Sequence, residues 1–257
     1  MTSDPIDSLQ ALQAANRVPA PAVCGAAAKG TLLIAGATGA LGQELVRRLA
    51  GRHRFAHTRV LAREPIRDGL HGVESVPARD SEFAQWPLVA ADTALVLFEP
   101  PRLYHDRERA LWTPQPAQLP DLARWLRACG VRTIAIVQPH DQGRLPEALK
   151  RGLASLDEQA VAALGFERVI LVRAAQKPKT ARFANPAERL AAWMLSIVHF
   201  MVPASEQPVR AAKVAELVDV ALRIAPPGVH VAAPELVWQA AQGELRAVVE
   251  GWLAVAR

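Results

Sequence analysis

The segment from Gly36 to Gly42, which reads Gly-Ala-Thr-Gly-Ala-Leu-Gly, lies between an apolar run and a run with helical periodicity. The apolar run, Thr31 to Ala35, is short and suits a strand that is buried on both faces. Beyond the loop, apolar residues recur at helical spacing, at Leu41, Leu45, Val46 and Leu49. We therefore expect a strand, a tight turn and a helix in this order.

The three glycines of this loop have separate physical roles in such a turn. Gly36 permits the turn, Gly39 lets backbone N–H groups approach a pyrophosphate, and Gly42 allows the helix to pack closely on the strand. The start of the helix then faces the anion. Together with Thr38 and Leu41, these glycines are the predicted cofactor-binding residues of the loop. The alternative is a glycine-rich turn that binds nothing.

The end of the second expected strand bears on which dinucleotide would bind. Arg59 to Ala62 is predicted as that strand, and Arg63 stands where an NAD-preferring site usually has an acid for the ribose hydroxyls. A guanidinium there suits a 2′-phosphate, so NADP(H) is the predicted cofactor and NAD the alternative. Glu64, one position later, could serve the ribose instead, and Arg63 could be a solvated charge at the end of a strand.

With these residues, the chain resembles the atypical short-chain dehydrogenase/reductase superfamily. The resemblance is to its small NAD(P)-binding members, which include isomerase-like reductases and nitrogen-regulator-type redox sensors. It is carried by Gly36, Gly39, Gly42 and Arg63 and extends as a pattern over roughly residues 30 to 225. It implies the Rossmann fold, a doubly wound parallel sheet, for residues 30–257.

Later segments continue the same alternation of strands and helices, which indicates an α/β fold with helices on both faces of a parallel sheet. The expected strands are 93–98, 132–137 and 168–173, and a helix is expected over 148–164. A small C-terminal helical region is expected to bind a substrate or a partner. Residues 1–29 are predicted to be an N-terminal extension that ends in a linker of small residues and prolines.

The chain lacks the residues that supply chemistry in the family it resembles. Tyr104 is the only tyrosine, and Glu108 rather than lysine stands four positions later. The resemblance places the family's tyrosine near Lys150 and its lysine near Ala154, so neither role is filled. In the family the tyrosine hydroxyl acts as general acid because the lysine and the cofactor lower its pKa.

Two other residues are candidates for a replacement proton donor. His140, which is followed by Asp141, is expected at the mouth of the sheet, and histidine exchanges protons near neutral pH. Tyr104 follows the fourth expected strand and could also face the cleft. The alternative is that both are polar loop residues, as is Glu99.

Composition excludes several other classes of protein. The chain has 257 residues and a formal charge of +5, but its arginines are interleaved with acids, so no nucleic-acid partner is expected. Cys24 and Cys129 have no metal-site spacing, and so few cysteines suggest reduced thiols and a cytoplasmic protein. No signal peptide is predicted at the N-terminus.

One apolar stretch, Ala191 to Pro203, is too short to cross a bilayer, which takes about 20 residues as a helix. We expect no transmembrane segment. The stretch is interpreted as a helix packed over the sheet or lining a substrate pocket. Its alternatives are a subunit interface, which would make the protein an oligomer, and a membrane-surface contact.

Two functional hypotheses follow from the sequence. The first is a non-catalytic NADP(H)-binding protein or redox sensor, which the missing tyrosine and lysine favour. The second is an NADPH-dependent oxidoreductase or isomerase with an unusual proton donor, which the intact glycine loop allows. The substrate and any protein partner are not predicted.

Overall fold

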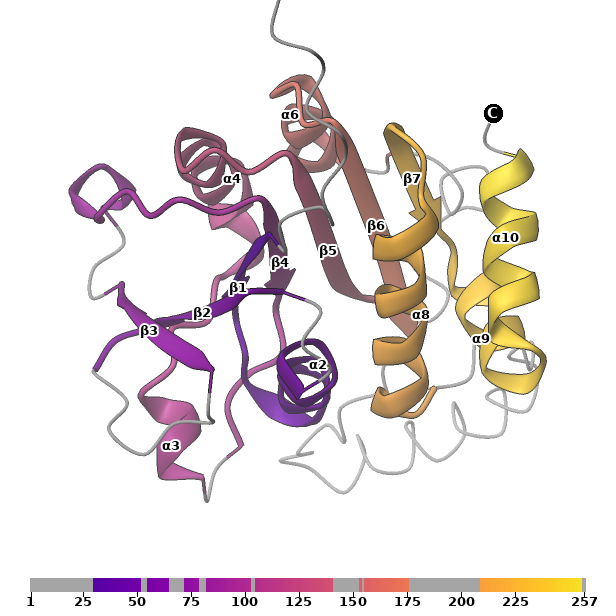
Figure 1. The fold of residues 1–257 in the computed structure, drawn as a ribbon, viewed down its shortest axis with the longest axis horizontal. Helices are drawn as coiled ribbons and strands as arrows, with labels where there is room; N and C mark the ends of the chain where they lie inside the picture. The colour runs from indigo at the N-terminus through magenta and orange to yellow at the C-terminus, as the bar shows by residue number, and fades with distance from the viewer. Residues whose placement is uncertain are drawn as a thin grey trace, which may run out of the picture.

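The computed structural model describes residues 30–51, 55–64, 72–78, 82–102, 105–140, 153, 155–175 and 209–255. Seven parallel strands form one sheet in the order β3-β2-β1-β4-β5-β6-β7 (Figure 1). Their bounds are β1 Thr31–Ala35, β2 His57–Ala62, β3 Val73–Pro77, β4 Thr93–Leu97, β5 Thr133–His140, β6 Arg168–Ala175 and β7 Gly228–Ala232. The predicted doubly wound α/β fold is confirmed.

Helices cover both faces of this sheet (Figure 1). The helices are α2 Gly39–Gly51, α3 Asp106–Arg109, α4 Leu119–Ala128, α6 Leu156–Ala163, α8 Ala211–Ile224, α9 Pro234–Gln242 and α10 Leu245–Val255, with single 3-10 turns at Phe83–Gln85 and Pro116–Gln118. Helices α2 and α8 pack against each other on one face, whereas α4 and α6 pack together on the other. We refer to these as the α2 face and the α4 face.

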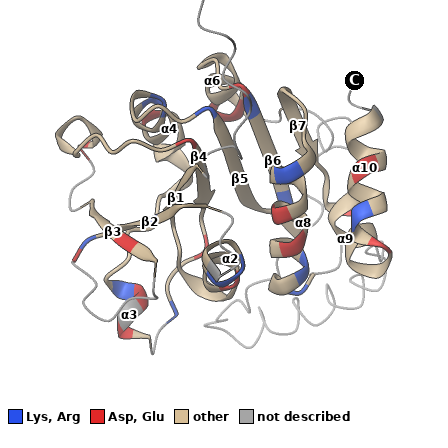
Figure 2. Ribbon diagram, in the orientation of Figure 1, with Lys and Arg blue, Asp and Glu red and all other residues tan. Residues whose placement is uncertain are grey.

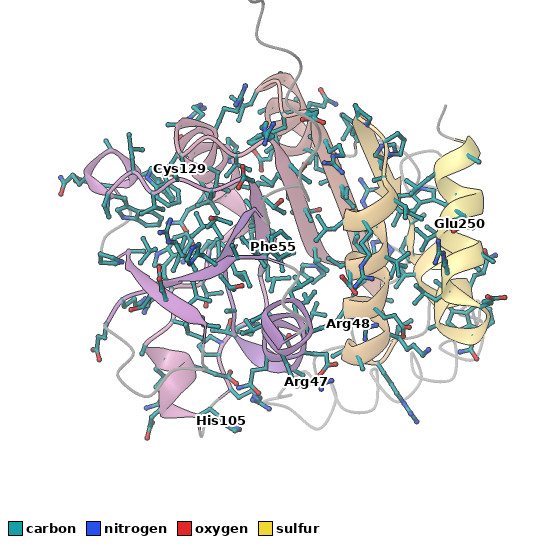
Figure 3. The ribbon with its side chains drawn as sticks, in the orientation of Figure 1. Arg47, Arg48, Phe55, His105, Cys129 and Glu250 are labelled. Atoms are coloured by element: carbon teal, nitrogen blue, oxygen red, sulfur yellow. The ribbon has the colours of Figure 1, made fainter. Side chains whose placement is uncertain are left out.

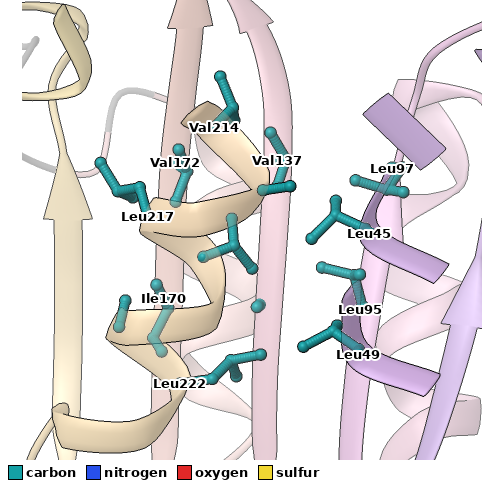
Figure 4. Close-up of a cluster of buried hydrophobic side chains, with 14 of the residues drawn as sticks. Leu45, Leu49, Leu95, Leu97, Val137, Ile170, Val172, Val214, Leu217 and Leu222 are labelled. Atoms are coloured by element: carbon teal, nitrogen blue, oxygen red, sulfur yellow. The ribbon is translucent and has the colours of Figure 1, made fainter. Parts of the chain in front are cut away.

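The alternation of side chains along each strand explains the two cores. In β1, Leu32 and Ile34 point to the α2 face, and Leu33 and Ala35 point to the α4 face. All four are almost fully buried, as expected for a strand covered on both sides. Figure 4 shows part of the α2-face core, in which Leu45 of α2 and Leu217 of α8 lie over the strands.

A partly buried charge cluster joins the two helices of the α2 face. Arg48 of α2 approaches Glu216 and Asp219 of α8, each at 3.5 Å, and lies between the two helices in Figure 3. Asp219 is buried and also pairs with Arg223 at 2.8 Å. This cluster fixes α2, and with it the glycine loop, relative to the C-terminal part of the chain.

Several elements differ from the sequence prediction. Of the helix expected over 148–164, residues 148–152 lie outside the described part, and helix α6 begins at Leu156, because Ser155 is extended and its hydroxyl accepts a hydrogen bond from the Glu158 amide at 3.2 Å. Strand β5 continues to His140, so that residue ends a strand instead of lying in a loop. Strand β7 was not predicted, and it extends the sheet within the region expected to be helical.

Several predictions lie outside the described residues. They concern the extension 1–29 with Cys24, the residues Tyr104, Asp141, Lys150 and Ala154, and the apolar stretch 191–203. Within the described part, none of the helices is both long and apolar enough to span a bilayer. Acidic and basic side chains occur together on the same elements, as on α8 in Figure 2.

Candidate functional site: the glycine loop and the carboxyl edge of the sheet

The glycine loop connects β1 to α2 at the point where the strand order reverses, since β1 pairs with β2 on one side and with β4 on the other. In open parallel sheets, ligands bind in the crevice at such a point, beyond the carboxyl ends of the strands. The structure places Gly36, Thr38, Gly39, Leu41 and Gly42 together there. The loop therefore has the position that the sequence predicted for a cofactor cradle.

The first two glycines are required by the backbone. Gly36 has a φ of +80° and Gly39 a φ of +71°, which side-chain-bearing residues rarely adopt. A Cβ on Gly36 would also overlap the carbonyl of Leu97 at the end of β4, and a Cβ on Gly39 would overlap the Glu99 side chain. Gly42 leaves no room for a Cβ against the Ala37 backbone, so it allows close packing, as predicted, but against the turn instead of the strand.

The first amides of α2 are bound by carboxylates of the same chain. The Gly39 amide donates to Glu108 Oε2 at 3.0 Å. The Ala40 and Leu41 amides donate to the two carboxylate oxygens of Glu99, at 3.2 Å and 2.8 Å. These are the N–H groups that a helix N-terminus offers to a phosphate, so the loop binds anionic oxygens in this structure.

Glu108 is the more deeply held of the two carboxylates. It is 1% exposed and also accepts hydrogen bonds from the Arg102 amide at 2.8 Å, from Arg102 Nε at 2.7 Å and from Gln43 Nε2 at 2.7 Å. Burial raises the pKa of Glu108, but the hydrogen bonds from Arg102 and Gly39 together with the charge of Arg102 outweigh it and hold the pKa below its ordinary value. Glu108 is therefore ionised at neutral pH, and its role is structural.

Thr38 joins the loop to the segment that follows β4. Its hydroxyl is fully buried and donates to the backbone carbonyl of Glu99, and it lies 3.1 Å from the hydroxyl of Thr113. These hydrogen bonds lie within the protein, and the predicted contact of Thr38 with the cofactor stays a prediction.

The residues after α3 lie across the carboxyl ends of β1 and β2. The Gly36 amide donates to the Trp112 carbonyl at 3.1 Å, and the Trp112 amide donates to the Leu61 carbonyl at 3.0 Å. The indole of Trp112 packs edge-on against Trp86, with ring centroids 4.9 Å apart, in the core of the α4 face. The segment is thus held both by backbone hydrogen bonds and by an aromatic cluster.

Arg63 lies immediately after β2, and its backbone amide donates to the Ala110 carbonyl at 2.7 Å. The residue is exposed. No ion pair of Arg63 occurs within the described part of the chain. Arg63 thus lies at the carboxyl edge of the sheet, where the sequence placed it.

A second feature of this edge is a cavity of about 300 Å³ on the α4 face, beyond β5 and β6. Its lining includes Phe98, Leu119, Gln138, His140, Glu158 and Arg173. His140 is buried, and Arg173 Nη2 pairs with Glu158 Oε2 at 2.7 Å in the interior. The structure therefore places the candidate His140 in a cavity that polar and apolar side chains line together, whereas Tyr104 is outside the described residues.

The sequence did not predict the roles of Glu99 and Glu108. Glu99 was interpreted as a polar loop residue, and Glu108 only as the residue that stands where a lysine was expected. A signal for Glu99 was present, because it follows the strand that pairs with β1, and residues at the ends of neighbouring parallel strands meet at one edge. No comparable signal exists for Glu108, which reaches the loop from a separate short helix.

No protein-family model and no curated protein sequence matches the chain. Among solved structures, a Rossmann-fold NAD(P)-binding family protein from Shigella flexneri is 16% identical over 66% of this chain and 86% of its own, with a TM-score of 0.36. Uronate dehydrogenase from Agrobacterium tumefaciens is 16% identical over 79% of this chain and 75% of its own, with a TM-score of 0.43. ADP-L-glycero-D-manno-heptose-6-epimerase from Helicobacter pylori is 14% identical over 82% of this chain and 79% of its own, with a TM-score of 0.45.

These likenesses are too distant to assign a role to any residue of this chain. The fold follows from the chain's own strand order, and the chemistry of the site follows from its own contacts. Within the described part, no cluster of His, Cys, Asp and Glu side chains could hold a metal ion.

Proposed function

We propose that this protein binds NADP(H) at the glycine loop and serves as a non-catalytic dinucleotide-binding or redox-sensing protein. One observation carries the proposal: the consecutive amides of Gly39, Ala40 and Leu41 all bind anionic oxygens at the start of α2. A diphosphate offers oxygens of the same charge and hydrogen-bonding type as a carboxylate. The partial positive charge at the helix N-terminus favours either anion.

The loop residues fit a dinucleotide, while Glu99 occupies part of the space that its phosphates would need. Gly36 and Gly39 give the turn its shape, and the start of α2 supplies the amides. When bound, the dinucleotide would supply hydride chemistry, and the chain's own part would be to bind and orient it. Arg63 at the end of β2 would pair with the 2′-phosphate, which favours NADP(H) over NAD(H).

The non-catalytic half of the proposal rests on the sequence. Tyr104 is the only tyrosine, and the residue four positions later is Glu108, so the chain contains no Tyr-x-x-x-Lys motif. Glu108 has the opposite charge to lysine and binds the Gly39 amide and Arg102. We infer an atypical member of the short-chain dehydrogenase/reductase superfamily that lacks the superfamily's usual proton donor.

Calorimetric titration with NADPH, NADH and ADP tests the binding function. NADPH is expected to bind the wild-type protein more tightly than NADH. Gly39→Asp should lose NADPH binding, because a side chain and a second negative charge enter the phosphate path. The matched control is Gly165→Asp, since Gly165 also has a positive φ, +73°, but nothing lies near its Cβ position.

Both glycine variants incur backbone strain, and only Gly39→Asp changes the loop. A folded Gly39→Asp protein that binds NADPH as the wild type does would contradict the site. A wild-type protein that binds none of the three nucleotides would contradict the function.

A second candidate function is an NADPH-dependent oxidoreductase or isomerase in which His140 donates the proton. The observation in its favour is the cavity that His140 shares with Arg173 and Glu158 at the carboxyl edge of the sheet. Steady oxidation of NADPH with any of a set of small ketones, enones and quinones would support it. The activity should then fall in His140→Ala but not in His230→Ala, because His230 is equally buried but bonds the Pro226 carbonyl away from this cavity.

A further inference from the structure

The two carboxylates at the start of α2 differ in how firmly they are held. Glu108 has donors on both oxygens, from the Gly39 amide, from the backbone and side chain of Arg102 and from the Gln43 side chain. Removing it from this position would leave the Arg102 guanidinium without its carboxylate partner, and the buried Gly39 amide without an acceptor. The cost of leaving such groups unsatisfied keeps Glu108 in place.

Glu99 is held by fewer contacts. In the described part of the chain its carboxylate accepts hydrogen bonds only from the Ala40 and Leu41 amides, and the residue is partly exposed. No arginine or lysine pairs with it there. Its side chain can therefore turn into solvent, where water replaces the two hydrogen bonds. This movement leaves no buried charge without a partner. Its backbone meanwhile stays bound to the Thr38 hydroxyl.

The position of the Glu99 side chain conflicts with a phosphate at the loop. It lies directly over Gly39, in the space that the missing Cβ of that glycine leaves open. A phosphate group at the Ala40 and Leu41 amides would meet a carboxylate that already holds both donors and carries the same sign of charge. The two anions cannot share the site.

We propose that the Glu99 carboxylate is an intramolecular competitor for the phosphates of the dinucleotide, and that it leaves the α2 amides when the ligand binds while Glu108 stays. This inference rests on the proposed function and concerns the regulation of the same site. Displacement frees the amides of Ala40 and Leu41, and Glu108 retains the amide of Gly39. Only molecules in which Glu99 has left the loop can bind NADPH. The apparent affinity is therefore the intrinsic affinity multiplied by the fraction of such molecules.

Titration calorimetry with NADPH on four folded proteins tests the inference: wild type, Glu99→Ala, Glu99→Gln and Glu250→Gln. Glu99→Ala should lower the Kd about tenfold or more, as expected if Glu99 leaves the loop in one molecule in ten or fewer. Glu99→Gln keeps an oxygen acceptor without the charge, so its Kd should fall by less. Glu250→Gln removes a carboxylate from α10, which lies near β7 at the other edge of the sheet from α3 and His105 in Figure 3, and should bind as the wild type does.

Amide hydrogen exchange of the proteins without ligand gives an independent readout. The Ala40 and Leu41 amides should exchange faster in Glu99→Ala than in the wild type and should regain protection when NADPH is added. The Gly39 amide should keep its protection in both proteins, because Glu108 still accepts from it. Unchanged exchange of Ala40 and Leu41 in Glu99→Ala would overturn the inference.

The outcomes separate this inference from the proposed function. If the wild type binds NADPH and neither Glu99 variant binds it more tightly, the proposal that Glu99 competes with the phosphates is wrong, and the proposed dinucleotide site stands. If no folded variant binds NADPH, the proposed function fails and the competitor with it. Should Glu99→Ala not fold, Glu99→Gln decides alone, since a lower Kd in that variant supports the competitor and an unchanged Kd contradicts it.

Discussion

Glu108 accepts a hydrogen bond from the Gly39 amide at 3.0 Å, although the two residues are 69 positions apart in the chain. A side chain from the short helix α3 therefore caps the helix that follows β1. The same residue stands four positions after Tyr104, the only tyrosine of the chain. A carboxylate at this position has a structural role, because a lysine here would bring a positive charge to an amide donor.

Replacing Glu108 should destabilise the protein and change its response to acid. Because hydrogen bonds lower the pKa of Glu108 in the folded state, its stabilising effect is complete above its unfolded pKa, about 4.3, and is lost as pH falls through the lower folded-state pKa. Glu108→Gln should reduce the free energy of unfolding at neutral pH by about 1 to 3 kcal/mol. The difference from the wild type should shrink in acid.

Urea unfolding at several pH values between neutral and about 3 measures this difference. The control is Glu74→Gln, because Glu74 pairs with Arg59 on an exposed part of β3. It should change the unfolding free energy by less than about 1 kcal/mol. An equal loss in the two variants would show that Glu108 is no more than a surface charge.

The parts of the fold that were predicted from sequence share a strong local signal. Strand β1 is a short apolar run followed by a glycine turn, and its predicted bounds are those observed. Strands β3 and β7, in contrast, were not predicted. Strand β3 carries the polar residues Glu74 and Ser75 and ends at Pro77, so it lacks the apolar run of a central strand. Strand β7 is only five residues long and lies at the other edge of the sheet.

The binding of carboxylates to the amides of the glycine loop could not be predicted from the loop itself. It depends on Glu99 and Glu108, which reach the loop only because β4 pairs with β1 and α3 folds back towards it. Their hydrogen bonds connect residues 58 to 69 positions apart, which no local pattern encodes. The sequence thus indicated the cradle, and tertiary structure determined what occupies it.

Arg63 should determine the preference between the two dinucleotides. Its exposed guanidinium lies at the end of β2, where it can pair with a 2′-phosphate. Arg63→Ala should reduce the NADPH preference over NADH about tenfold, which corresponds to the loss of about 1.4 kcal/mol of binding. Arg47→Ala, which removes an exposed charge from α2, serves as the control for net charge.

Titration of both variants with NADPH and NADH measures the ratio of their dissociation constants. The ratio should change in Arg63→Ala alone. Equal binding of the two dinucleotides by the wild type would remove the argument for a 2′-phosphate site at Arg63.

The thiol of Cys129 should be unreactive in the folded protein. It is buried, and burial raises its pKa more than its hydrogen bond with the Val89 backbone lowers it. Since the thiolate is the reactive form, labelling should require opening of the structure around α4. In a Cys24→Ser background, Ellman's reagent should react about a hundredfold more slowly with the native than with the urea-unfolded protein. Reaction at the unfolded rate would show that the thiol is accessible.

The buried ion pair of Arg173 and Glu158 should stabilise the carboxyl edge only while both partners are present. Their side chains are each 3% exposed and 2.7 Å apart. Glu158→Gln removes one partner of this buried ion pair, which should cost about 3 to 5 kcal/mol. The double variant Glu158→Gln with Arg173→Met removes both charges of the pair and should be less destabilised than the single variant.

Urea unfolding of the wild type, the two single variants and the double variant forms a thermodynamic cycle for this pair. The interaction between the two sites should make the double variant more stable than the sum of the single changes predicts. Additive changes would show that the pair contributes nothing beyond its separate contacts. A double variant less stable than Glu158→Gln would mean that Arg173 stabilises the cavity through contacts other than Glu158, and the charge-pair account would then be wrong.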